Sequence, residues 1–334
     1  MLSPRRGRAP RPGGAIKNAG MRQRFVDRIV PFAAILIFCA AIAVLFDQFK
    51  SVSLEAVLAS VLAMPKHQVV AALGLTAASY LLLTGYDFLA LCYVRRHLPW
   101  RDVEFTSFTA FAFSNNIGFQ LLSGGSMRYR IYSNLGLQGG DILRIVAFCT
   151  FAYALGVITV GGLVFLFEPA EIASLLRLPR PLISACGLGL LGFGAGYLVV
   201  AAKWRRPIVF RRFRLRPPSL PLAIAQLGLA SLDAVLAGTV FFVLLPADVG
   251  LGFQAYLGIY MVAATISVLS LVPGGLGVFE TAITLTTAPP SKAAALGAFL
   301  AYRLIYFMIP FVIAIVCFAL HEMRRKFEKT LLAP

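Results

Sequence analysis

A proline and three glycines interrupt an apolar stretch that is otherwise long enough to cross a membrane. The stretch runs from Tyr256 to Ala288, and the interruption reads LVPGGLGVFE at 271–280. Proline and glycine disfavour an uninterrupted helix, and backbone groups freed at membrane depth must be buried in protein or face water. The sequence therefore predicts a broken or re-entrant segment here, with Glu280 directly after the break.

A second run has the same layout 150 residues earlier. It reads LLSGGSMRYR at 121–130, with a glycine pair, an aromatic residue and a charge at the same offsets, and here the charge is positive. We expect the two runs to approach each other and to form two halves of one substrate site. The polar residues Ser114, Asn115 and Asn116 precede the first glycine pair, and they can satisfy freed backbone groups or contact a ligand.

Apolar runs recur along the whole chain. Hydrophobic residues make up 59% of its 334 residues and charged residues 13%, whereas soluble domains carry about 25% charged residues. Runs of about 20 apolar residues are typical of membrane-spanning helices. We predict an all-α polytopic transmembrane bundle. Its six full spans are expected at Ile29–Phe46, Val69–Val94, Ile142–Phe167, Leu182–Ala202, Leu220–Leu245 and Ala294–Leu320, and its two broken segments at Phe105–Gly125 and Phe253–Ala288.

Positive charge collects in alternate loops. The segments 1–28, 95–141, 203–219 and 321–334 hold 24 of the 31 Lys and Arg residues, and the loops on the opposite side hold five. By the positive-inside rule, this places both termini in the cytoplasm. These loops account for the net charge of +17, so we expect contact with anionic lipid and no nucleic-acid partner.

Each half of the chain has three full spans and one broken segment, in the same order. An odd number of spans inverts the second half, as in many transporters, whose broken helices meet near the membrane midplane. We therefore predict an inverted repeat, and chance spacing of apolar runs is the alternative. The expected organisation is a basic disordered tail at 1–28, a first repeat at 29–167, a second repeat at 168–320 and a cytoplasmic tail at 321–334.

Charged side chains inside membrane segments are costly and indicate function or internal ion pairs. Arginine recognises phosphate through two parallel hydrogen bonds, the N-terminal ends of helices attract anions, and a carboxylate suits an amine. We predict that Arg128 and Arg130 bind a headgroup phosphate and that Glu280 binds an amine or forms a gating ion pair. Without lipid, Arg128 and Glu280 are expected to bind each other. Three further charges are expected as pair partners or supporting residues: Asp87, Asp233 and Arg303. The alternative is that all these charges only stabilise the bundle.

The predicted substrate-binding residues follow the two glycine-rich runs: Gly124, Gly125, Arg128, Tyr129, Arg130, Pro273, Gly274, Gly275, Gly277 and Glu280. No nucleophile–base arrangement, P-loop or dinucleotide-binding fingerprint stands in a suitable context. The five cysteines lie in apolar runs and lack metal-ligand spacing. We therefore expect no catalytic residues, no metal site and no cofactor.

Five pieces of the chain, in this order, resemble the membrane domain of a known family. They are SYLLLTGYD at 79–87, LSGGSMRYRIYS at 122–133, the segment from SLD to LLP at 231–246, VPGGLGVFE at 272–280 and YRLIY at 302–306. The family that they resemble is the bacterial lysylphosphatidylglycerol synthase/flippase family, the multiple peptide resistance factor. The resemblance covers about residues 69–320.

Full-length members of that family use this membrane domain to move aminoacylated phosphatidylglycerol between leaflets, and a separate cytoplasmic domain makes the lipid. The resemblance implies a flippase of the bacterial inner membrane, acting on anionic or aminoacylated phospholipid and linked to antimicrobial peptide resistance. We expect the transferase domain to be absent, so no enzyme activity is implied. The alternative is a non-transporting scaffold for a separately encoded synthase. That synthase and further copies of the chain, as a homo-oligomer, stay open as partners.

Overall fold

The computed structural model describes residues 53–117, 120–204, 208–210, 213–246, 249–270, 272–287 and 291–331. The predicted first span at Ile29–Phe46 and the predicted tail at 1–28 lie outside the described residues. In chain order the elements are α2 (Leu54–Leu62), α3 (Lys66–Val94), α4 (Trp100–Ile117), α5 (Gln120–Asn134), α6 (Gly139–Phe167), α7 (Pro169–Leu176), α8 (Arg180–Lys203), β1 (Ile208–Phe210), β2 (Phe213–Leu215), α9 (Leu220–Leu244), α10 (Phe253–Leu269), η2 (Pro273–Gly275), α11 (Val278–Thr287), α12 (Lys292–Tyr302), η3 (Arg303–Met308) and α13 (Ile309–Leu331).

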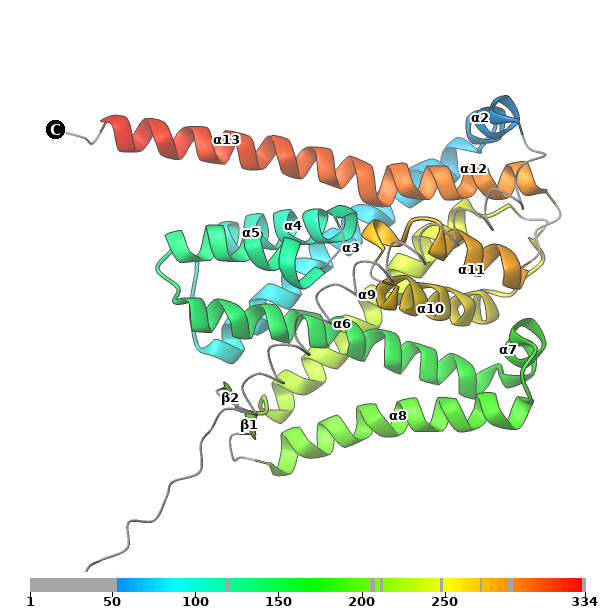
Figure 1. Ribbon diagram of the computed structural model, residues 1–334, viewed down its shortest axis with the longest axis horizontal. Coiled ribbons are helices and arrows are strands. Elements are labelled where there is room, and N and C mark those ends of the chain that lie inside the picture. The colour runs from blue at the N-terminus through cyan, green and yellow to red at the C-terminus, as the bar shows by residue number, and fades with distance from the viewer. Residues whose placement is uncertain are drawn as a thin grey trace, which may run out of the picture.

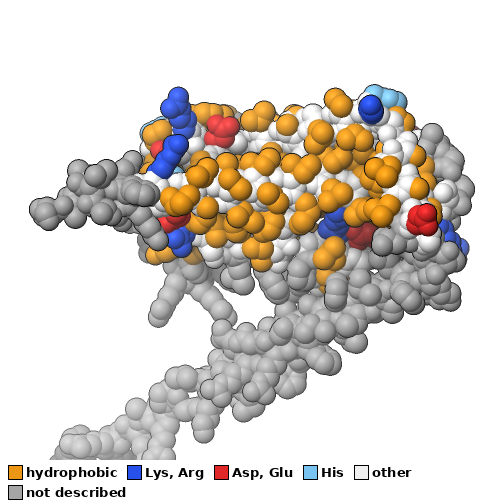
Figure 2. All heavy atoms as spheres, turned by 90° about the horizontal axis from the view of Figure 1, so that it is seen from above, with side chains coloured by type: hydrophobic (Ala, Val, Ile, Leu, Met, Phe, Trp, Pro, Cys, Tyr) orange, Lys and Arg blue, Asp and Glu red, His pale blue; other side chains and the backbone are white. Residues whose placement is uncertain are grey.

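Five helices of the described residues are long and apolar enough to cross a membrane. They are α3, α6, α8, α9 and the continuous helix from Lys292 to Arg324. Each overlaps a span predicted from the sequence. Hydrophobic side chains predominate on the outer face seen in Figure 2, as expected where lipid replaces water. The protein is a polytopic helical membrane bundle.

Both predicted broken segments are helical hairpins. In the first, α4 packs against α5, and in the second, α10 packs against α11 with η2 between them. Figure 1 places α4 and α5 towards the end of the bundle that carries the start of α6 and the C-terminal end of α13. It places α10 and α11 towards the other end, beside α7. The two hairpins therefore occupy opposite ends of the bundle, as the sequence predicted.

The first break does not fall at its glycine pair. Helix α4 ends at Ile117 and α5 begins at Gln120, so Gly124 and Gly125 lie inside α5. The prediction of broken backbone at this pair is therefore wrong. A β-carbon at Gly124 would overlap the Ser114 hydroxyl of α4, so glycine here allows two helices to approach closely.

The second break falls where it was predicted. Gly274, Gly275 and Gly277 have φ angles of 60°, 61° and 76°, in the left-handed region that favours glycine. A β-carbon at Gly275 would also lie 2.8 Å from Cβ of Ser267. The chain therefore turns here between α10 and α11 in a conformation that larger residues would strain.

The last spanning helix contains the π-helical segment η3. Pro310 lacks an N–H group, and its ring crowds the carbonyl of Tyr306 one turn earlier. The Tyr80 hydroxyl donates to that carbonyl at 3.3 Å. The Asn116 side-chain amide donates to the carbonyl of Phe307 at 3.1 Å. Side chains of α3 and α4 thus satisfy carbonyls that the irregular helix frees.

The two halves of the chain cross where α3 packs against α9. A β-carbon at Gly85 of α3 would lie 2.9 Å from Leu229 of α9. Helix α6 also approaches α9, and a β-carbon at Gly156 would overlap the carbonyl of Ala230. Small residues at these positions bring the helix backbones together, as is common in membrane bundles. This crossing holds Asp87 and Asp233 inside the protein.

Several elements were not predicted. The loops contain the short helices α2 and α7 and an antiparallel hairpin of β1 and β2. Helix α13 continues to Leu331, beyond the predicted end of the last span at Leu320. These elements lie outside the predicted spans, and α2 (9 residues) and α7 (8 residues) are apolar but too short to cross a membrane.

Candidate functional site

Arg128 and Asp87 form a buried ion pair between α5 and α3. Arg128 Nε donates to Asp87 Oδ1 at 2.9 Å, and Nη2 donates to Oδ2 at 2.7 Å. The Tyr132 hydroxyl also donates to Oδ1, at 3.0 Å. The guanidinium lies 4.6 Å from the centre of the Phe111 ring. Arg128 is 3% exposed and Asp87 fully buried, so this two-pronged pair fastens α5 to the helix crossing.

Arg303 and Glu280 form a second pair, at the second break. Arg303 Nε and Nη2 lie 2.8 and 2.7 Å from Glu280 Oε1. Glu280 Oε2 accepts a hydrogen bond from the backbone N–H of Gly277 at 2.9 Å. Arg303 Nη1 donates to the carbonyl of Gly274. One arginine at the start of η3 therefore binds both the carboxylate and the backbone of the break.

The two hairpins meet at this point. The β-carbon position of Gly274 lies 3.6 Å from the carbonyl oxygens of Asn115 and Asn116, at the end of α4. Helix α4 also packs against η2 and η3. The predicted approach of segments 114–128 and 271–280 is therefore confirmed. Asn116 binds carbonyls, which favours the structural interpretation of the SNN run over ligand contact.

The charges pair differently from the sequence-based hypothesis. Arg128 and Glu280 do not bind each other, because each has its own partner in Asp87 and Arg303. Two parallel hydrogen bonds and full burial leave Arg128 satisfied without a ligand. Arg130 is the accessible arginine of the run, and it pairs with Glu322 of α13 at 3.0 Å. The structure thus joins the predicted charges in separate pairs.

Whereas the buried Asp141 pairs with Arg96 and Arg144, Asp233 is a buried acid without an arginine partner in the part of the chain that the structure describes. Its Oδ1 accepts a hydrogen bond from Ser79 Oγ at 3.2 Å, and its Oδ2 accepts one from the Tyr86 hydroxyl at 3.0 Å. Across the described residues, no ion pair reaches Asp233. Sequence reasoning missed its donors. Ser79 and Tyr86 are seven residues apart, two helical turns, and this spacing could have placed them on one face of α3.

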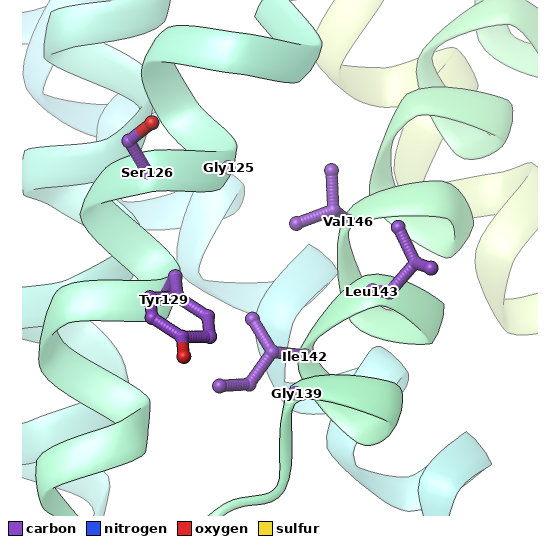
Figure 3. A pocket seen from close by; sticks show the side chains of 7 residues that line it. All are labelled: Gly125, Ser126, Tyr129, Gly139, Ile142, Leu143 and Val146. Carbon is purple, nitrogen blue, oxygen red and sulfur yellow. The ribbon is translucent and has the colours of Figure 1, made fainter.

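A pocket of about 390 Å³ lies between α5 and α6. Figure 3 shows Tyr129 and Ser126 on the α5 wall opposite Ile142, Leu143 and Val146 of α6. Gly125 and Gly139 complete its lining. Of the predicted site residues, Gly125 and Tyr129 thus line one pocket, whereas Arg128 is buried against Asp87.

A larger groove of about 640 Å³ lies on α3, α4 and the η3–α13 helix, and the sequence-based predictions missed it. Its walls are mostly apolar, including Leu81, Phe108 and Ile313. Arg101 and Glu104, on the first turns of α4, add opposite charges to its lining. The consecutive helices α3 and α4 build the groove together with the distant η3–α13 helix, so no single sequence run indicates it.

The chain can be compared with known proteins through its sequence. The family described as the lysylphosphatidylglycerol synthase TM region matches residues 31–314. The chain belongs to this family. The match spans both helical hairpins and the four buried acids of the described residues, Asp87, Asp141, Asp233 and Glu280.

Relatives within the lysylphosphatidylglycerol synthase TM family differ in length. A Synechocystis protein is 35% identical over 289 residues, covering 85% of this chain and 89% of its own length. The inner membrane protein YbhN of Escherichia coli is 32% identical over 309 residues, covering 91% of this chain and 95% of its own length. The phosphatidylglycerol lysyltransferase of Staphylococcus haemolyticus is 23% identical, covering 85% of this chain but 33% of the lysyltransferase. This chain therefore resembles one part of that longer enzyme.

Proposed function

We propose that this membrane protein moves phospholipid between the leaflets of the bacterial inner membrane, with both termini in the cytoplasm. The substrate class is anionic or aminoacylated phosphatidylglycerol, and the chain has no catalytic step of its own. The observation that carries the proposal is the contact between two interrupted helical hairpins, bridged by Arg303 to the Gly274 carbonyl. Broken helices that meet inside a bundle are the usual substrate sites of membrane transporters.

The two buried ion pairs act as locks on the hairpins. Arg128–Asp87 fastens α5 to α3, and Arg303–Glu280 fastens the second break to η3. A buried charge that loses its partner is strongly unfavourable, so each lock opens only if another charge replaces the one withdrawn. The phosphate that both proposed lipids carry supplies a negative charge that can bind a released arginine. The inverted relation of the two halves, also part of this proposal, would let the hairpins open to opposite sides in turn.

The lipid itself needs an apolar surface for its acyl chains and accessible charges for its headgroup. The groove on α3, α4 and α13 provides an apolar lining together with Arg101 and Glu104. Arg130 and Glu322 form a second, exposed pair of opposite charges. We assign first contact with the phosphate to Arg101 and Arg130, and we assign Arg128 to holding the closed state.

The test is a leaflet-resolved assay in proteoliposomes that contain labelled phosphatidylglycerol or its lysyl ester. We expect the reconstituted protein to exchange these lipids faster than protein-free liposomes do. Ala77→Trp fills the groove and should slow exchange. Ala78→Trp is the matched control, because Ala78 is exposed on the same helix and does not line the groove. Equal exchange with and without folded protein would overturn the proposal.

The same assay addresses the scaffold alternative. A scaffold for a separately encoded synthase would bind that enzyme without exchanging lipid, and variants of the groove would leave synthase binding intact. The groove favours transport over this alternative, because a scaffold has no need of a lipid-sized apolar surface.

A further inference from the structure

The four buried acids of the described residues are not equivalent, and Asp141 is one of the three that bind arginine. Asp87 and Glu280 each bind an arginine at 2.7 Å, whereas Asp233 binds only neutral hydroxyl groups. Asp233 is 5% exposed and lies on α9 at the crossing with α3. A carboxylate buried without a cation is unfavourable, and two hydroxyl donors offset only part of that cost.

The groups that face Asp233 come from four elements. Those that titrate are all tyrosine hydroxyls: Tyr80 and Tyr86 from α3, Tyr153 from α6, Tyr260 from α10 and Tyr306 from η3. Within the described part of the chain, no lysine, arginine or histidine is among its electrostatic partners. The environment can therefore donate hydrogen bonds to Asp233 but cannot neutralise its charge.

We propose that Asp233 is a proton-binding site and that its protonation couples lipid movement to the proton gradient. The ligand is H⁺, which converts the carboxylate into a neutral acid. This inference rests on the proposed lipid transport for its coupling step. The proton-binding step stands on the geometry of Asp233 alone.

Protonation would rearrange the hydrogen bonds around Asp233. In the charged state Ser79 donates to Asp233, so the neighbouring Tyr306 hydroxyl, 3.1 Å away, donates to Ser79. A proton on Oδ1 makes Asp233 the donor and Ser79 the acceptor, which releases the Ser79 hydroxyl hydrogen. In the proposed rearrangement, Ser79 then donates to the Tyr306 oxygen. The hydroxyl hydrogen of Tyr306 must then turn to another acceptor. One proton thus reverses a chain of hydrogen bonds that ends in η3.

Both buried ion pairs, the two locks, lie close to the hydrogen-bonded groups around Asp233. Tyr86, which donates to Asp233, directly precedes Asp87, the partner of Arg128. Tyr306 lies one helical turn after Arg303, the partner of Glu280, within η3. A π-helical segment is a frequent place for a functional rearrangement. A change in the charge of Asp233 is therefore transmitted to both hairpins. It acts through Tyr86, the residue before Asp87, and through Tyr306, one turn after Arg303.

The first experiment measures proton binding directly. Infrared difference spectra of the purified full-length protein in nanodiscs are recorded from about pH 4 to about pH 9. This range covers carboxyl groups with ordinary pKa values and carboxyl groups whose pKa is raised by burial. We expect a protonated-carboxyl band that disappears in Asp233→Asn and remains in Asp87→Asn and Glu280→Gln. Thermal unfolding checks that each variant is folded. Absence of such a band from the folded wild type, or its persistence in Asp233→Asn, would overturn the site.

The second experiment measures coupling in proteoliposomes with a trapped pH dye and a clamped membrane potential. If one proton moves with each lipid, a gradient of one pH unit should sustain a lipid asymmetry of up to about tenfold. Asp233→Asn should remove both the asymmetry and the lipid-dependent dye signal. Asymmetry that follows a sodium gradient instead would overturn proton coupling. If the wild type moves no lipid but the Asp233 band titrates, the transport proposal and the coupling fail while the proton site stands.

Discussion

Arg303 donates a hydrogen bond to the backbone carbonyl of Gly274 and binds the Glu280 carboxylate with the same guanidinium. A side chain of the last spanning helix thereby closes the break of the second hairpin. The Phe307 ring lies 5.0 Å from the guanidinium. This geometry uses the planar, many-donor shape of arginine, so charge alone is not sufficient to maintain it.

Arg303→Lys should therefore destabilise the protein although it keeps the charge. A lysine ammonium cannot bind the carboxylate and the carbonyl with the same fixed fork. We expect a clear fall in the melting temperature of the purified protein. Arg144→Lys is the control, because Arg144 is half exposed and Asp141 keeps a second arginine partner in Arg96. Equal effects of the two variants would show that the fork geometry at Gly274 is unimportant.

The Arg128–Asp87 pair should behave as one unit. Removing either partner leaves a buried charge, with a cost of about 3–5 kcal/mol. Asp87→Asn combined with Arg128→Gln removes both charges, so its cost should be well below the sum of the two single effects. Chemical unfolding of the four proteins completes this cycle. Additive effects would mean that the two side chains do not interact in the folded protein.

Much of the bundle could be predicted from the sequence, because the hydropathy of a span and the charge of a loop are signals that extend over many residues. All five spans within the described residues and both hairpins are predicted, most to within a few residues, but α5 and α13 extend about ten residues beyond their predicted ends. The glycine pairs show the limit of this approach. Gly274–Gly275 follows Pro273 and breaks the helix, whereas Gly124–Gly125 has no proline beside it and lies inside α5. A glycine pair alone does not distinguish a break from a close helix contact.

The ion-pair partners could not be predicted for a different reason. Asp87 and Arg128 are 41 residues apart, and their pairing depends on how α3 and α5 are rotated about their axes. Hydropathy does not specify that rotation for helices that are apolar on most faces. The groove on α3, α4 and α13 depends on the same rotations. Burial and partner choice at the candidate site are therefore properties of the packed bundle.

Glu280→Gln tests whether the Glu280 carboxylate binds the amine of an aminoacylated headgroup. The sequence-based hypothesis predicts a larger loss for aminoacylated lipid than for plain phosphatidylglycerol. Because Glu280 binds Arg303 and the Gly277 N–H, we expect comparable losses for both lipids. Proteoliposome exchange of the two labelled lipids provides the measurement. A selective loss for the aminoacylated lipid, in folded protein, would restore Glu280 as the amine-binding residue.

Two exposed serines test the proposed orientation. Ser219 lies at the start of α9 and Ser174 in α7. In a variant without the five natural cysteines, each serine is replaced in turn by cysteine. A membrane-impermeant thiol reagent applied to intact cells should label Ser174→Cys and leave Ser219→Cys unlabelled, because the loop before Ser219 is strongly basic. The reverse pattern would overturn the orientation.

Gly275→Ala tests the backbone of the second break. Gly275 has a φ angle of 61°, and an added β-carbon would lie 2.8 Å from Cβ of Ser267. Left-handed backbone at a residue other than glycine costs of order 1–3 kcal/mol, and the close contact adds to this. We expect a lower melting temperature and slower lipid exchange.

The matched control for that variant is Gly189→Ala. Gly189 lies inside α8, and an added β-carbon there meets nothing within 4 Å. Alanine is the better helix former by about 1 kcal/mol, so this variant should be as stable as the wild type or slightly more stable. If Gly275→Ala matched it in stability and exchange, the left-handed turn at 273–277 would not be required. The contact between the hairpins would then depend on the side chains of Arg303 and Glu280 rather than on the glycine backbone.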